Sequence, residues 1–221
     1  MMRWLDRILR RRPASAGAAS PPRYAVIDTE TSGLDVARDR LLTIGAVGVR
    51  DGRVETADAF YAVLRQPAPT VGQDILIHRV GTGEQAAGED PATVLAAFSR
   101  WCEGRWAVGF HAGFDRRMIE RTLREHRLEP SPLRGWIDLA VVAPLLLAGR
   151  AGPGGKAPMS LDEWLDSFGI DDCERHHALG DAQATAQLLL PVLHAAQARG
   201  LADPAALSAE SEAALKLRAM R

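Results

Sequence analysis

Short apolar runs alternate with polar, glycine-rich or proline-rich breaks along most of this chain. Three runs, at residues 24–27, 41–49 and 54–64, are rich in β-branched and aromatic residues and predict strands. Asp51-Gly52, between the second and third runs, is a strong hairpin signal. Three successive strands joined by short connections predict an antiparallel meander rather than the β-α-β start of a Rossmann fold.

Helical patterning dominates the rest of the chain, around a fourth apolar run at residues 106–110. Start signals support several helices, among them Asp90-Pro91 and a capping box that begins at Ser160. Pro191 is expected to kink a long helix or to start a new segment. The stretch through Gly88 is glycine-rich, and residues 149–158 are predicted to form a flexible loop. The predicted helices cover residues 92–102, 113–126, 139–147, 161–168, 179–197 and 203–220.

The first 22 residues differ in composition from the rest. Residues 2–12 place apolar side chains on one side and arginines on the other, which suits a membrane surface, a partner groove or nucleic acid. A frayed terminus with a solvated basic face explains the same pattern. Residues 13–22 are typical of a linker. We therefore expect a basic segment and linker at 1–22, a main domain at 23–200 and a helical extension at 201–221.

The composition of the chain bears on its number of domains and its cellular compartment. With 221 residues, 47% hydrophobic content and a net charge of -1, the chain suits one domain, and its bulk charge favours no particular partner. Cys102 and Cys173 are too few for a disulfide framework, which indicates a reducing compartment. No apolar run reaches membrane-spanning length, and the N-terminus lacks the apolar core of a signal peptide. These features predict a cytoplasmic location.

Acidic residues follow the apolar elements at four places. Asp28 and Glu30 lie one residue apart at the end of the first strand, so both project from the same side. Asp115 stands at a strand-to-helix junction, and Asp181 lies among small apolar residues near the start of the long helix. Each has an ordinary explanation alone, such as a polar turn or a favourable helix-start position. His176, five residues before Asp181, alternatively belongs to a solvated loop.

Taken together, the acidic positions predict a metal site. Two adjacent carboxylates on a buried strand repel each other and resist desolvation, and a divalent cation removes both costs. Oxygen ligands are those that Mg²⁺ and Mn²⁺ prefer. Four carboxylates can hold two such ions, an arrangement suited to displacement at a phosphodiester, with His176 taking a proton from water.

Three motifs in the chain match those of one known family. The chain resembles the DEDDh (DnaQ-like) 3′–5′ exonucleases, which include the epsilon subunit of bacterial DNA polymerase III and RNase T. Its first motif is matched by residues 27–34, its second by 109–115 and its third by 176–185, in the family's order. His176 has the spacing from Asp181 of the h-subclass, and His177 stands where the y-subclass would have tyrosine. The resemblance covers about residues 23 to 196.

The resemblance implies an α/β fold of the RNase H-like type, with a five-stranded mixed sheet flanked by helices. It implies two ions, Mg²⁺ or Mn²⁺, held by Asp28, Glu30, Asp115 and Asp181, and the release of nucleoside 5′-monophosphates from a 3′ end. Phe110-His111 replaces the family's usual His-Asn, so His111 is expected to supply the polar contact of the asparagine. Asp138 matches a recurrent family position, although helix capping explains it as well. The residues expected near the substrate are Thr31, Ile77, His78, His111 and Phe114.

The leading interpretation is an exonuclease for single-stranded or frayed 3′ ends, with DNA slightly favoured over RNA. An RNA-trimming relative of the RNase T or oligoribonuclease type is the nearest alternative. A non-catalytic nucleic-acid-binding module on the same fold is a second, although clustered carboxylates would repel phosphate and give such a module no benefit. The family resemblance leaves open a homodimer or a polymerase-type protein partner.

Overall fold

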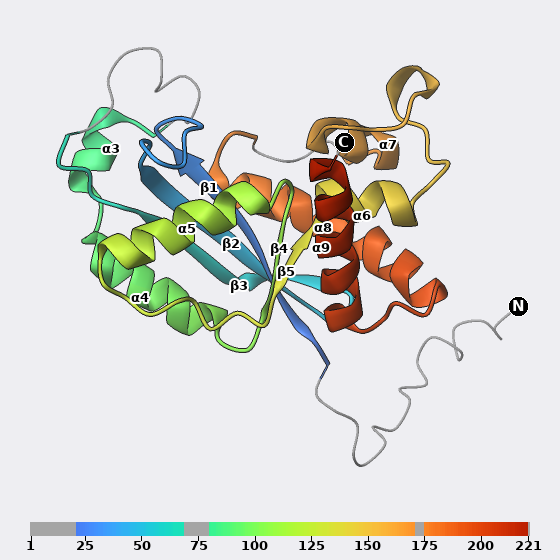
Figure 1. The fold of residues 1–221 in the computed structure, drawn as a ribbon. Coiled ribbons are helices and arrows are strands. Elements are labelled where there is room, and N and C mark those ends of the chain that lie inside the picture. The colour runs from blue at the N-terminus through green and yellow to red at the C-terminus, as the bar shows by residue number, and fades with distance from the viewer. Residues whose placement is uncertain (1–20, 69–79, 171–174, 221) are drawn as a thin grey trace, which may run out of the picture.

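A five-stranded mixed sheet forms the centre of the molecule (Figure 1). The computed structural model describes residues 21–68, 80–170 and 175–220. The strands are β1 Arg23–Thr31, β2 Leu41–Arg50, β3 Arg53–Val63, β4 Trp106–Gly109 and β5 Trp136–Asp138, in the spatial order β3-β2-β1-β4-β5. The strands β1, β2 and β3 pair antiparallel, whereas β4 and β5 extend the sheet in parallel from β1. The predicted meander and mixed sheet are confirmed.

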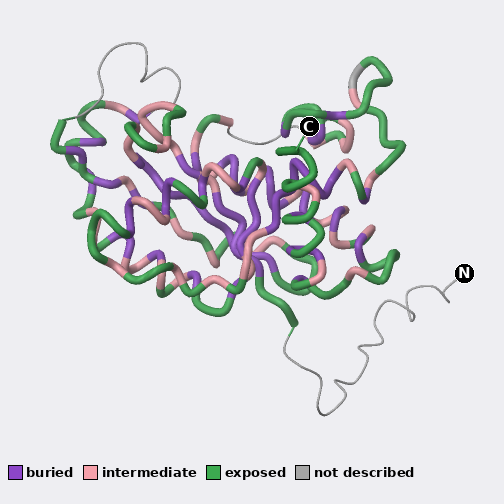
Figure 2. Tube along the Cα trace, in the orientation of Figure 1, coloured by how far each residue is buried: buried purple, intermediate pink, exposed green. Residues whose placement is uncertain are grey.

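Helices cover both faces of this sheet (Figure 1). Side chains alternate along β1, so Ala25 and Ile27 join a core with α4 and α5, whereas Tyr24 and Val26 join a core with α6, α7 and α8. Figure 2 shows the resulting buried layer through the middle of the molecule. The helices are α3 Thr82–Ala87, α4 Pro91–Cys102, α5 Gly113–Glu125, α6 Leu139–Leu146, α7 Leu161–Phe168, α8 Ala178–Ala198 and α9 Pro204–Ala219.

Three features differ from the sequence prediction. The strand β5 was not recognised because it has only three residues and leads directly into α6. A short helix, α3, occupies part of the glycine-rich stretch. The helix α8 continues through Pro191 as one element, so the prediction of a new segment there is wrong. Buried side chains on both sides of the proline, Leu188 and Val192, anchor the helix to the core and offset the lost hydrogen bond.

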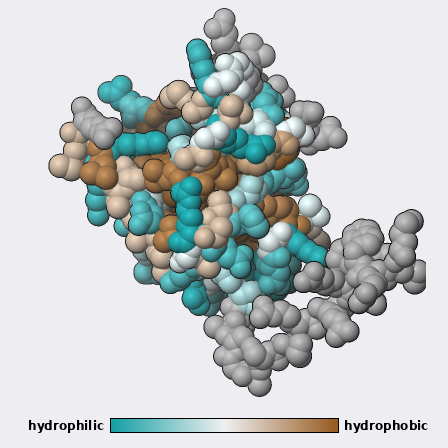
Figure 3. Space-filling model, turned by 90° about the vertical axis from the view of Figure 1, so that its right-hand side faces the viewer, coloured by the Kyte–Doolittle hydropathy of each residue, from teal (hydrophilic) through white to brown (hydrophobic). Residues whose placement is uncertain are grey.

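The C-terminal helix α9 packs against β5 and α6. Ser208 Oγ donates to the carbonyl of Trp136 at 2.8 Å, and the backbone N–H of Asp138 donates to Ser211 Oγ at 3.0 Å. Leu207 is buried in the same core as α8. Figure 3 shows hydrophobic surface on this side of the molecule, and the exposed apolar side chains of Leu145 and Leu217 lie on α6 and α9. Among the described residues, no helix is both long enough and apolar enough to cross a membrane.

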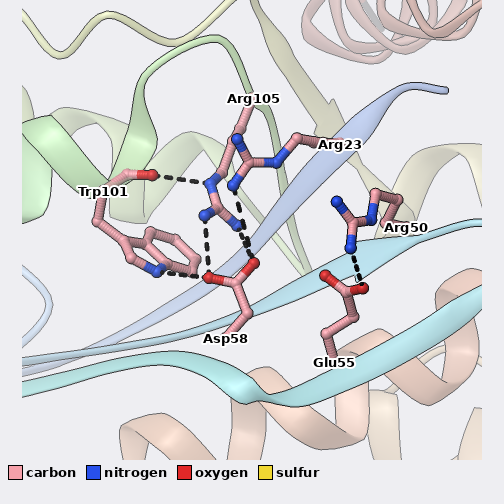
Figure 4. Close-up of polar contacts among 6 residues, drawn as sticks. All are labelled: Arg23, Arg50, Glu55, Asp58, Trp101 and Arg105. Carbon is pink, nitrogen blue, oxygen red and sulfur yellow. Dashed lines mark hydrogen bonds and ion pairs between the residues drawn. The ribbon is translucent and has the colours of Figure 1, made fainter. Parts of the chain in front are cut away.

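An ion-pair network ties the edge strand β3 to the rest of the sheet (Figure 4). Arg105 donates to both oxygens of Asp58, at 2.7 and 2.9 Å, and its guanidinium lies 4.0 Å above the ring of Trp101. The indole N–H of Trp101 also donates to Asp58 at 3.0 Å. Gly48 leaves the space that this carboxylate fills, since a Cβ there would lie 2.4 Å from Asp58 Oδ2. These contacts hold the irregular pairing between β2 and β3.

Candidate metal centre

Three of the predicted metal-binding carboxylates converge. Asp28 and Glu30 project from the C-terminal end of β1, and Asp181 lies in the first turn of α8. One oxygen from each of the three lies within 4.8 Å of the others. Asp28 and Glu30 remain partly accessible, and Asp181 is 9% exposed. This all-oxygen set at the sheet edge suits a hard divalent cation.

A glycine in β2 allows α8 to come this close. Gly45 pairs with Asp28 across the β1–β2 ladder. A Cβ built on Gly45 would lie 2.2 Å from the backbone of Ala178 and Leu179, where α8 begins. Because Gly45 has no side chain, the start of α8 can pack directly against the sheet, and Asp181 then lies close to Asp28.

Asp115 lies outside this group of three, on the other face of β1. Its Oδ1 accepts a hydrogen bond of 2.6 Å from the hydroxyl of Thr29, which alternates with Asp28 and Glu30 along the strand. Both side chains are buried. Asp115 nevertheless acts on Asp28, because its charge is one cause of the raised pKa of Asp28. The fourth predicted ligand is thus tied to the strand that carries the first two.

Negative charge outweighs positive charge in this cluster, and the pKa values of its carboxyl groups reflect that imbalance. Burial raises the pKa of Asp28 well above its usual range, and the charges of Asp115, Asp181 and Glu30 raise it further. Burial also raises the pKa of Asp115 to about 7, although the Thr29 hydrogen bond opposes the shift. The pKa of Asp181 is raised as well, mainly by burial. Buried carboxylates that disfavour ionisation together are those that a divalent cation would stabilise, so the residues fit the predicted ions.

The segment before α8 places a cation and a histidine beside Asp181. Arg175 donates through Nη1 to Asp181 Oδ1 and through Nε to Asp162 Oδ1, the latter at 2.5 Å. The backbone N–H of His176 donates to Asp181 Oδ2 at 3.2 Å, and the histidine is exposed. His177 is the N-cap residue of α8, and its ring stacks on Tyr61 with a centroid separation of 4.7 Å. The backbone of His176 is therefore bonded to one of the predicted metal ligands.

The turn after β4 is held by Asp138. This carboxylate accepts from the backbone N–H of His111 and from that of Ala140, each at 3.0 Å. Asp138 is therefore the N-cap of α6, as the sequence indicates, and it also fixes the turn that leads into Asp115. His111 and His176 both have a positive φ, 64° and 61°, a backbone conformation that is uncommon outside glycine.

The predicted substrate residues have different surroundings. Thr31 is partly buried, and its hydroxyl donates to the carbonyl of Gly33 at 2.7 Å. His111 is exposed at the end of β4, whereas Phe114 packs against the core of α4 and α5. Ile77 and His78 lie outside the described residues.

Three residues that serve this site were missed by sequence reasoning: Gly45, Thr29 and Arg175. A glycine inside an apolar strand is a recognised sign of close backbone approach, so Gly45 carried a usable signal. The partnerships of Thr29 with Asp115 and of Arg175 with Asp162 and Asp181 join positions whose proximity no local pattern shows.

Comparisons with known proteins identify the family to which the chain belongs. The chain is 29% identical over 181 residues to a DNA polymerase III subunit epsilon-like protein of Rhodobacter capsulatus, which covers 80% of the chain and 25% of that protein. It is 31% identical over 166 residues to a PolC-type DNA polymerase III of Listeria welshimeri, covering 75% of the chain and 11% of the polymerase. The chain therefore spans a quarter or less of the length of these two relatives.

Solved structures share the fold. Exonuclease I of E. coli, in complex with a dT13 oligonucleotide, superposes with a TM-score of 0.69 at 19% identity, covering 80% of this chain and 42% of that one. Exonuclease X, in complex with 5′ overhanging duplex DNA, superposes with a TM-score of 0.64 at 23% identity. The match covers 85% of this chain and 99% of that one. A family model described as "Exonuclease" matches residues 25–189, which contain all three motifs and the carboxylates of the site. The chain belongs to this exonuclease family, and the DnaQ-like resemblance of its motifs is confirmed.

Proposed function

We propose that this protein is a 3′–5′ exonuclease that removes nucleoside 5′-monophosphates with the help of two divalent ions, Mg²⁺ or Mn²⁺. The observation that carries the proposal is the convergence of Asp28, Glu30 and Asp181, with His176 bonded to Asp181 by its backbone. The family supplies the reaction class, and these residues supply the ligands and base that hydrolysis requires.

Each residue has a distinct role in the proposed reaction. Asp28, Glu30 and Asp181 hold the ions, and Asp115 contributes from the other face of β1. When bound, the ions supply Lewis acidity for the phosphodiester and lower the pKa of water at the site. The exposed ring of His176 accepts the proton of the attacking water, while the bond of its N–H to Asp181 fixes the backbone. The turn that Asp138 holds presents His111 beside the site for polar contact with the terminal nucleotide.

We propose single-stranded or frayed 3′ ends as the substrate, with DNA slightly favoured. Support comes from exonucleases I and X, whose solved complexes contain an oligonucleotide and an overhanging duplex. An RNA-trimming activity remains the alternative within the family. The relatives, one an epsilon-like protein and one a PolC-type DNA polymerase III, favour a polymerase-type partner over a homodimer. Cys102 is free and buried, in keeping with a reducing compartment such as the cytoplasm.

A time course on matched DNA and RNA oligomers tests the proposal. The oligomers carry a 5′ label and an unpaired 3′ end, and the reactions contain Mg²⁺, Mn²⁺ or EDTA. We expect a ladder that shortens from the 3′ end, requires metal and is absent for Asp181→Ala and Asp28→Ala. His176→Ala should slow turnover more than it weakens metal binding. Equal activity in wild type and either aspartate variant would overturn the mechanism, and no ladder with either metal would favour the non-catalytic binding module.

A further inference from the structure

The guanidinium of Arg175 lies between two carboxylates of different exposure. One partner, Asp181, belongs to the candidate metal centre, and its side chain is 13% exposed. The other, Asp162, lies in the first turn of α7, and its side chain is 61% exposed. Arg175 is itself only 25% exposed, so its charge is partly removed from solvent. The arginine therefore links the buried carboxylate of the site to an exposed one at its rim, which is Asp162.

Arg175 acts on the site as a positive charge. Its guanidinium donates to Asp181 and to Asp162, and Asp181 belongs to the same cluster of carboxylates as Asp28 and Glu30. A cation placed among these carboxylates reduces the repulsion between them, as a bound metal ion would.

A divalent ion and Arg175 would compete for the same ligand atom. Asp181 Oδ1 accepts from the guanidinium, and Oδ2 accepts from the N–H of His176. Both oxygens of Asp181 therefore already have donors. An ion that draws on Asp181 Oδ1 must displace the guanidinium, and two like charges this close repel each other strongly. Asp162 remains within 2.5 Å of Nε and can keep the displaced side chain at the rim.

We propose that Arg175 is an internal counter-ion of the metal centre, which a divalent ion displaces from Asp181 and which Asp162 then retains. The inference rests on the proposed function, because it needs a site that binds metal. It makes Arg175 a positioning residue: its side chain neutralises Asp181 before metal enters, and its backbone leads directly into His176.

Mn²⁺ binding to the full chain tests this, measured by titration calorimetry and by the electron paramagnetic resonance signal of free Mn²⁺. Arg175→Gln should tighten the binding of Mn²⁺ by about tenfold, because the competing cation is gone. Asp162→Asn should weaken binding several-fold, because the guanidinium then has Asp181 as its remaining carboxylate partner. In the double variant the loss of Asp162 should matter little, since no guanidinium remains to be retained.

Asp166→Asn is a matched control, because it removes an exposed acidic charge from the same helix without touching Arg175. It should bind Mn²⁺ as wild type does, and thermal unfolding should show that all variants are folded. Unchanged or weaker binding in Arg175→Gln overturns the inference. If that variant does not fold, Asp162→Asn decides alone, and unchanged or tighter binding overturns the inference. A wild type that binds no Mn²⁺ and shortens no oligomer refutes the proposed function as well, whereas active wild type with an unaffected Arg175→Gln refutes only this step.

Discussion

The carboxyl group of Asp115, beside the candidate metal centre, lowers the stability of the fold when it ionises. Its pKa is raised to about 7, mainly by burial, so ionisation disfavours the folded state. Below the usual pKa of an aspartate the folded and unfolded chains are both protonated, and the cost is absent. The cost grows as the pH rises from about 4 and is complete above about 7.

Asp115→Asn should therefore stabilise the metal-free protein in a pH-dependent way. In EDTA we expect almost no gain in the free energy of unfolding near pH 4 and a gain of about 4 kcal/mol at pH 8. The asparagine keeps an oxygen to accept from Thr29, so the local packing stays the same. Urea unfolding at several pH values measures the difference. A gain that is the same at every pH would mean that ionisation of Asp115 is not its source.

Asp58 titrates with the opposite sign. Hydrogen bonds from Arg105 hold the pKa of this carboxyl below its usual value, so the ionised form stabilises the fold. This contribution is complete above the usual aspartate pKa and is lost as the pH falls through the lowered value.

Asp58→Asn should lower the free energy of unfolding at pH 7 by about 3 kcal/mol, because it leaves the guanidinium of Arg105, 4% exposed, without its counter-charge. Trp101 contacts the pair and provides a fluorescence signal for urea unfolding. Glu55→Gln is the control, because the Arg50–Glu55 pair is more exposed and should cost less than about 1 kcal/mol (Figure 4). Equal losses in the two variants would contradict a special role for the buried pair.

At the scale of elements, the contact between β2 and α8 decides the geometry of the site. Gly45→Ala would force the backbone of α8 away from the sheet, since its Cβ would overlap Ala178. We expect a loss of about 1–3 kcal/mol in the free energy of unfolding and weaker Mn²⁺ binding, as Asp181 moves from Asp28. Gly83→Ala in α3 is the control, because nothing lies within 4 Å of its Cβ and alanine favours a helix. Wild-type Mn²⁺ affinity in Gly45→Ala would show that the close approach is not needed.

The elements that sequence predicted are those with strong local signals. Ser160 and Glu163 form the expected capping box, and Asp51-Gly52 makes the hairpin turn with φ of 53° and 68°. The strand β5 and the helix α3 were not predicted, because each is too short to show a periodic pattern of apolar residues. In the site, the strand alternation of Asp28 and Glu30 was sufficient to place them together. Thr29 points to the opposite face of β1 from Asp28 and Glu30. Its contact with Asp115 depends on the packing of α5 against that face, which the sequence pattern does not show.

For the whole molecule, the question is where the folded unit ends. The sequence predicts a domain at 23–200 with an extension at 201–221, yet α9 supplies side chains to the core and to β5. Ser211 bonds the backbone of Asp138, whose carboxylate in turn holds the turn before Asp115. Because β5 is an edge strand of three residues, α9 covers an edge that would otherwise lie open.

Truncation after Gly200 should therefore damage the protein beyond the loss of a tail. Burial of Leu207 and the hydrogen bonds of Ser208 and Ser211 together contribute about 4 kcal/mol, a large part of the stability of a domain. We expect a large fall in melting temperature and weaker Mn²⁺ binding, because the path from Ser211 through Asp138 to the turn before Asp115 is lost. Removal of residues 1–20 is the comparison and should leave both unchanged. If the chain without α9 melts and binds Mn²⁺ like the full chain, then α9 is an extension and the catalytic unit ends near residue 200.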